Sequence, residues 1–128
     1  MLNYARQRAM EILKISRTAV LATSGPAGVQ AGEFPCEACG LDVYLLVPRT
    51  SDHLFNLEFE SGVALLAGGW ELRGEARLVP PDAAARELRL ARMPGAEWCV
   101  LVRVIPRLLQ VRREAGWGSV ETIDLKSS

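Results

Sequence analysis

The sequence of 128 residues predicts a single α+β domain, mainly β, whose antiparallel sheet is long enough to close into a small barrel. Residues 70–78 alternate apolar and charged side chains, which is typical of a sheet with one buried and one solvated face. The first three predicted strands are joined by short turns, and a parallel crossover needs about a dozen residues or more. These neighbouring strands must therefore be antiparallel.

The composition favours a globular protein, with 49% hydrophobic and 23% charged residues. Fifteen Lys and Arg balance fifteen Asp and Glu (15 against 15), so no net field attracts a polyanion and we expect no nucleic-acid partner. No apolar run approaches the roughly 20 residues of a membrane helix, and no signal peptide is evident. The odd number of cysteines, 3, does not suggest a secreted disulfide scaffold. We expect a cytoplasmic protein with no membrane partner.

The first half of the chain predicts one helix and three strands. Apolar residues at spacings of three and four predict a helix over residues 2–14. A β-branched run predicts a strand at 18–23, ended by the glycine and proline turn at 24–28. Residues 29–35 return as the second arm of a hairpin, residues 36–40 form a second turn, and residues 41–47 form the third strand.

The second half predicts two further helices and the remaining strands. After Pro48, either Thr50 or Ser51 can cap a helix that ends near residues 61–62. Apolar residues 63–67 and the alternating residues 70–78 predict two strands joined by a glycine turn. A helix is predicted at 83–93. The last elements are a strand at 98–105, a break at Pro106, a continuation at 108–111 after a bulge, and a short extended tail.

The stretch from Arg49 to His53 is the best candidate for a phosphate site. It follows a predicted strand and starts a predicted helix, whose first N–H groups lack partners within the helix. Arg49 supplies a planar cation, Thr50 and Ser51 supply hydroxyls, and His53 supplies a further donor. A capped helix with a solvated arginine and a surface histidine accounts for the same residues, so both interpretations remain open.

Cys36 and Cys39 have the spacing of redox and zinc motifs. A structural zinc site needs four ligands, and beyond this pair the chain offers only Cys99 and His53. Because the pair lies in a predicted turn, we interpret it as two small hairpin residues able to form an incidental disulfide. A thiol-based redox or zinc role remains an alternative.

Several segments taken together carry a resemblance to a known family. They are residues 18–24 with the following glycine turn, the stretch 44–57 (YLLVPRTSDHLFNL), and the later strands at 62–65, 74–79 and 102–106. Their order and spacing resemble the FMN-binding split barrels of the pyridoxamine 5'-phosphate oxidase superfamily over nearly the whole chain. The resemblance implies one FMN-binding domain over residues 1–128, folded as a six-stranded antiparallel split barrel with flanking helices. It also implies a homodimer with two FMN sites along its interface.

The resemblance also implies which residues bind the cofactor. The FMN phosphate would lie at the turn after the third strand, where His53 occupies the place of a lysine common in the family and Asn56 braces the loop. Two residues of the third strand would lie beside the ring system, and an aromatic residue of the partner's tail would cover it. The implied cofactor-binding residues are Arg49, Thr50, Ser51, His53, Asn56, Leu46, Val47 and Trp117.

The function implied by the resemblance is a flavin-dependent oxidoreductase with a small-molecule redox substrate. Because the flavin carries the redox chemistry, no side chain need act as acid or base, and we name no catalytic residue. The tail at 123–128 lacks the arginine-bearing ending of the vitamin-pathway oxidases. The alternative is a cofactor-free or deazaflavin-binding dimer that acts as a ligand-binding protein, and His53 in place of lysine favours it.

Overall fold

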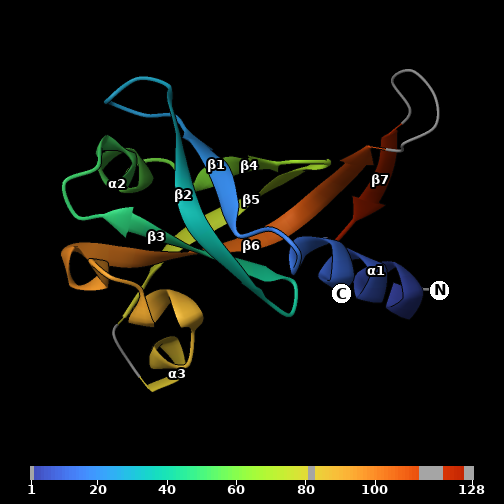
Figure 1. The fold of residues 1–128 in the computed structure, drawn as a ribbon. Coiled ribbons are helices and arrows are strands. Elements are labelled where there is room, and N and C mark those ends of the chain that lie inside the picture. The colour runs from blue at the N-terminus through green and yellow to red at the C-terminus, as the bar shows by residue number, and fades with distance from the viewer. Residues whose placement is uncertain (1, 81–82, 113–119, 126–128) are drawn as a thin grey trace.

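The computed structural model describes residues 2–80, 83–112 and 120–125. Figure 1 shows a sheet curled around one core, with α1 at one end and α2 and α3 at the other. No helix in these ranges is long and apolar enough to cross a membrane. The elements are α1 (Leu2–Leu13), β1 (Thr18–Thr23), β2 (Gln30–Cys39), β3 (Asp42–Pro48), α2 (Asp52–Leu57), β4 (Gly62–Ala67), β5 (Trp70–Val79), α3 (Ala83–Arg86), the 3-10 turns η1 (Arg89–Arg92) and η2 (Ala96–Trp98), β6 (Cys99–Arg112) and β7 (Val120–Asp124).

The strands form one antiparallel sheet in the order β3-β2-β1-β4-β5-β6-β7. A further pairing between β3 and β6 closes the first six strands into a barrel, and β7 extends the sheet beyond β6. The predicted mainly-β fold and its six-stranded barrel are confirmed. The described chain adds a seventh strand, which lies in the tail that the sequence predicted to be extended.

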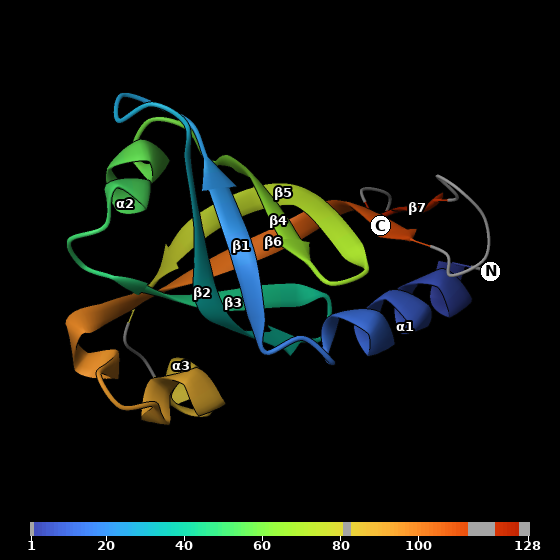
Figure 2. The same ribbon diagram turned by 45° about the horizontal axis from the view of Figure 1, so that its top comes forward.

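The barrel is split where β2 changes its partner. Residues 30–35 of β2 pair with β1, whereas residues 36–39 pair with β3. The end of β3, residues 46–48, pairs with β6 instead of β2. Helix α2 lies at this opening, between the β1–β2 hairpin and β3 (Figure 2). Two polar side chains of α2, His53 and Asn56, are buried there.

The core lies inside the barrel, where alternate residues of each strand point inward. Helix α1 packs Ala5, Ala9 and Ile12 against this core, as their spacing predicted, and adds Leu13. The indole N–H of Trp70 donates to Ser16 Oγ at 3.0 Å, which ties β5 to the segment after α1. Inward leucines with no exposed surface are Leu21, Leu45, Leu65, Leu72 and Leu109.

Three predicted boundaries were wrong. The helix predicted to end near residues 61–62 ends at Leu57. The predicted turn at 36–40 is strand as far as Cys39, because Cys36 points into the core and keeps the strand alternation. The chain instead turns at Gly40, whose φ of +63° favours glycine. The predicted helix at 83–93 is broken after Arg86, because Leu88 takes an extended conformation and the chain continues as η1.

The predicted break at Pro106 was also wrong, whereas the predicted bulge was confirmed. Strand β6 runs without interruption through Pro106, which pairs with Gly74 of β5. The register then shifts between Arg73 and Gly74, so that Arg107 is the extra residue opposite them. Proline has no N–H to donate to the ladder of a regular strand. It is tolerated at a bulge because the ladder is already interrupted there.

Candidate functional site

The turn between β3 and α2 presents three of the predicted phosphate ligands. Ser51 N donates to Pro48 O at 3.0 Å and closes the turn, while Arg49 N donates to Trp98 O at 3.0 Å and anchors it to η2. Arg49 and Thr50 are exposed, and Ser51 is half-buried. The fold therefore holds one cation and two hydroxyls together on a short, hydrogen-bonded turn.

The side chains of this turn keep donors available to a ligand. Ser51 caps α2 by accepting a hydrogen bond from His53 N at 3.2 Å, which leaves its own hydroxyl proton free to be donated. Arg49 Nε makes a long contact of 3.4 Å with Glu97 O, and within the described ranges no carboxylate pairs with this guanidinium. Arg49 can therefore present a fork of N–H donors to an anion.

Beside the turn lies a cavity of about 420 Å³, which we call the turn cavity. It separates the ends of β3, β5 and β6 from the segment that carries α3, η1 and η2. Its volume falls within the usual range for small-molecule sites. Apolar residues line most of it, two arginines add positive charge, and its main lining residues are Leu46, Arg49, Val79, Arg86, Val100 and Leu101.

The predicted ring-binding residues have separate positions. Leu46 lines the turn cavity beside Arg49. Val47 points into the barrel core and has no exposed surface, so only its backbone could reach a ligand. Trp117 lies outside the described residues. Arg86 and Glu97 also line the turn cavity. The sequence did not mark these two, because a charged residue in a predicted helix or loop is usually solvated.

The other two predicted residues, His53 and Asn56, face the β1–β2 loop. With Thr23 they form a buried hydrogen-bonded group that we call the brace cluster. Thr23 Oγ1 and His53 Nδ1 are 2.8 Å apart. The imidazole also packs edge-on against Phe34, with ring centroids 5.3 Å apart. The structure therefore separates His53 from the solvent-facing Arg49 and Thr50.

Asn56 is the centre of the brace cluster and has no exposed surface. Its Oδ1 accepts from Ala27 N at 2.9 Å, and its Nδ2 donates to Gly28 O at 2.9 Å and to Thr23 Oγ1 at 3.2 Å. A Cβ at Gly25 would lie 2.8 Å from Asn56 Oδ1, so the loop approaches closely only because glycine stands there. One amide therefore fastens the β1–β2 loop to α2.

His53 is held in its neutral form. Burial lowers its pKa below the ordinary value, and the neighbouring Asp52 carboxylate only partly opposes this effect. A neutral imidazole bonded to Thr23 supports the loop and adds no permanent charge to the turn. Arg49 is thus the cation that the turn itself presents to solvent.

The lowered pKa of His53 predicts a pH dependence of stability. The unfolded chain binds this proton more readily than the folded protein, so the free energy of unfolding should fall as pH drops from about 6.5 towards the folded-state pKa. Above that window this contribution is fully present. Urea unfolding between pH 5 and 8 measures the slope. His53 is the only histidine, so His53→Gln should remove the slope, and an equal slope in that variant would contradict the assignment.

The cysteine pair is not arranged for zinc or a disulfide. Cys36 is buried, Cys39 is exposed, and both are free thiols. The two residues are three positions apart on β2, so their side chains point to opposite faces of the strand. Burial raises the pKa of Cys36 to about 11, although Arg89 partly opposes this. The expected incidental disulfide is therefore wrong. No group of three or more metal-ligating residues occurs within the described ranges.

No family model and no curated protein sequence matches the chain. Solved structures do resemble it. A Clostridium acetobutylicum protein related to general stress protein 26, of the pyridoxinephosphate oxidase family, superposes with a TM-score of 0.71 and 14% identity over 98% of this chain and 96% of that one. The chain has the split-barrel fold of the pyridoxamine 5'-phosphate oxidase-like proteins. The fold that the resemblance implied is thereby confirmed.

Two other split barrels differ in what they bind. A FAD-binding protein from Mycobacterium smegmatis has a TM-score of 0.61 and 18% identity, over 80% of this chain and 91% of that one. A heme-binding protein from the same organism has a TM-score of 0.70 and 17% identity, over 94% of this chain and 57% of that one. At such identities the likeness establishes the fold, and the ligand must be argued from this chain's own residues.

Proposed function

We propose that the protein is an FMN-binding split-barrel flavoprotein whose phosphate site is the turn at Arg49, Thr50 and Ser51. One observation carries the proposal. A guanidinium with no carboxylate partner among the described residues stands beside two hydroxyls at a largely apolar cavity of about 420 Å³. An anion bonded to a fixed arginine fork, with an aromatic body on the adjoining apolar wall, suits that arrangement.

The turn cavity would hold the ring system of the cofactor. Leu46 and Leu101 offer apolar surface to a planar ring, and Arg86 of α3 lines the other side of the cavity as a second cation. When bound, the flavin would supply hydride or electron transfer. The protein would bind and orient it and exclude water from one face. On this basis we propose an oxidoreductase with a small-molecule redox substrate.

The proposal extends to assembly and location. The family resemblance supports a homodimer, in which Trp117 of one copy would cover the ring bound by the other. The balanced charge of the chain supports a protein without a nucleic-acid partner. We place this homodimer in the cytoplasm.

A second candidate follows from the position of His53. Because this imidazole is buried and neutral, the turn lacks a charged donor at the place where the family commonly has lysine. A cofactor-free or deazaflavin-binding dimer that acts as a ligand-binding protein needs no such donor. The two candidates therefore differ in whether the turn binds FMN.

An absorption spectrum distinguishes them. The purified protein is mixed with FMN, separated from the excess by gel filtration, and its spectrum recorded. We expect flavin to elute with the protein and to show its absorption bands at about 370 and 450 nm. If all the FMN elutes free, the flavoprotein proposal is wrong. The same experiment is then repeated with a deazaflavin. Retention of the deazaflavin favours the deazaflavin-binding dimer, and its free elution favours the cofactor-free dimer.

A further inference from the structure

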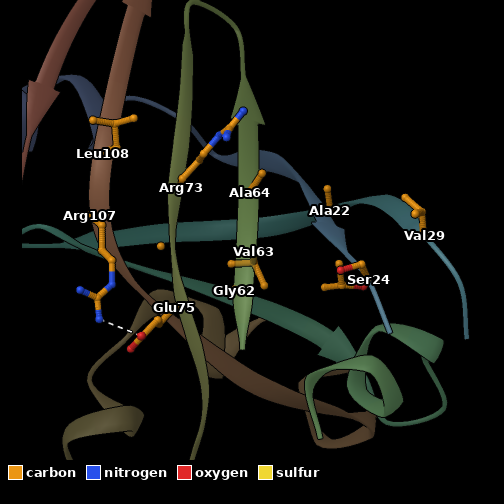
Figure 3. A pocket seen from close by; sticks show the side chains of 12 residues that line it. Ala22, Ser24, Val29, Gly62, Val63, Ala64, Arg73, Glu75, Arg107 and Leu108 are labelled. Atoms are coloured by element: carbon orange, nitrogen blue, oxygen red, sulfur yellow. Dashed lines mark ion pairs between the residues drawn. The ribbon is translucent and has the colours of Figure 1, made fainter. Parts of the chain in front are cut away.

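A second and larger cavity lies on the outside of the barrel, over β1, β4, β5 and β6 (Figure 3). Its volume is about 660 Å³, and we call it the outer-face cavity. None of the described residues lines both this cavity and the turn cavity. The residues that define its chemistry are Ala22, Ala64, Arg73, Glu75, Arg107 and Leu108.

The bulge in β6 shapes the floor of this cavity. Arg107 is the extra residue of the bulge, and Leu108 pairs with Arg73 on β5. Opposite the bulge, a Cβ on Gly74 would lie 2.2 Å from Ile105 O, so the two backbones meet more closely than any other residue would allow. Bulges redirect side chains. Here the bulge places Arg107 and Leu108 at the same cavity.

The charges on the floor do not cancel. Arg107 Nη2 lies 2.7 Å from Glu75 Oε1, so these two groups neutralise each other. Arg73 lines the same cavity, and no acidic residue in the described ranges pairs with it. Figure 3 shows its side chain extending from β5 over the neighbouring strand β4. The cavity therefore carries one uncompensated positive charge.

The rest of the lining is small and apolar or carries a hydroxyl. Ala22, Ala64 and Leu108 leave a smooth surface beside Arg73, and Ser24 stands at the end of β1. Apolar walls with a few convergent polar groups are the usual make-up of a small-molecule site.

We propose that the outer-face cavity binds a small organic acid, separately from the turn cavity. The apolar or aromatic body of the acid lies on Ala22, Ala64 and Leu108, and its anionic group pairs with Arg73. The Arg107–Glu75 pair fixes the floor and keeps Glu75 from repelling the ligand. The proposal does not depend on FMN binding, because the two cavities have no lining residue in common within the described part of the chain.

The test uses the fluorescent aromatic sulfonate 8-anilinonaphthalene-1-sulfonate as probe. It is titrated in the absence of FMN, which is itself an aromatic anion and would compete for the cavity. The titration is made with the original protein and with Arg49→Ala, whose turn cavity has lost its exposed arginine. We expect one saturable class of sites that both proteins share. The uncharged N-phenyl-1-naphthylamine should bind more weakly than the sulfonate, because it cannot pair with Arg73.

Two variants locate the site. Arg73→Ala should weaken sulfonate binding about tenfold, the usual effect of losing a hydrogen bond to a charged group. Arg92→Ala is the matched control, since Arg92 is exposed, lies in η1 and lines neither cavity. It should leave the affinity unchanged. Ala64→Leu should lower the affinity for both probes, because the larger side chain fills the apolar part of the cavity.

Three results would overturn the proposal. They are the absence of saturable sulfonate binding, an affinity that Arg73→Ala leaves unchanged, and an equal loss in Arg92→Ala. The last would show that only the net charge of the protein matters. A failure of the flavin proposal would appear as FMN that elutes free from gel filtration. These titrations do not use that readout, so the two failures are distinguishable.

Discussion

Gly74→Ala is expected to lower the free energy of unfolding by about 3 kcal/mol, the upper part of the usual range for overpacking. The added Cβ would lie 2.2 Å from Ile105 O. That atom belongs to the backbone of β6, so no side-chain rotation relieves the clash. The strands must separate where β5 and β6 pair. Urea unfolding monitored by tryptophan fluorescence measures the loss.

Gly68→Ala is the matched control for this substitution. Gly68 precedes β5 in the tight turn from β4, and a Cβ built there meets nothing within 4 Å. Its stability should stay within about 1 kcal/mol of the original protein, since alanine restricts the unfolded chain without strain. Equal unfolding midpoints for the two variants would contradict the close approach of β5 and β6.

Asn56→Ala is expected to cost about 3 kcal/mol, because a buried group that loses its partner costs about 1–3 kcal/mol. The substitution leaves Ala27 N and Gly28 O without the amide that now bonds them, and it removes a donor to Thr23. The β1–β2 loop would lose its link to α2. Urea unfolding measures the loss, and hydrogen exchange at the Ala27 amide should become faster.

Gln30→Ala provides the comparison. Gln30 Nε2 donates to Ala27 O at 2.9 Å, so it contacts the same loop, but this side chain is only half-buried. A single hydrogen bond of this kind contributes about 1 kcal/mol. If Asn56→Ala costs no more than Gln30→Ala, the brace cluster is not the main support of the loop.

Much of the fold could be predicted from the sequence because the signals are local. The alternation at 70–78 identifies β5, and the β-branched run at 18–23 identifies β1. The errors have tertiary causes. Cys36 extends β2 because its side chain reaches the core, and Leu88 ends α3 because the chain bends to bury it. Neither burial is visible in local spacing.

The candidate site could be predicted in part. Arg49, Thr50 and Ser51 share one turn and stay together in the structure. The place of His53 depends on the β1–β2 loop, which folds back over α2 from about thirty residues away. In the sequence, the charged residues that line the outer-face cavity fit the pattern of an ordinary strand with a solvated face. Only the bulge, which is a property of pairing between β5 and β6, brings Arg73 and Arg107 to one cavity.

The central claim is that Arg49 binds the phosphate of FMN, and riboflavin, which lacks the phosphate, tests it most directly. Affinities for FMN and riboflavin are measured by equilibrium dialysis with the original protein, Arg49→Ala and the exposed control Arg92→Ala. The original protein and the control should prefer FMN by about tenfold or more, as expected for a charge-assisted pair. Arg49→Ala should lose that preference while its affinity for riboflavin stays the same. An undiminished preference for FMN in Arg49→Ala would contradict the assignment of the turn.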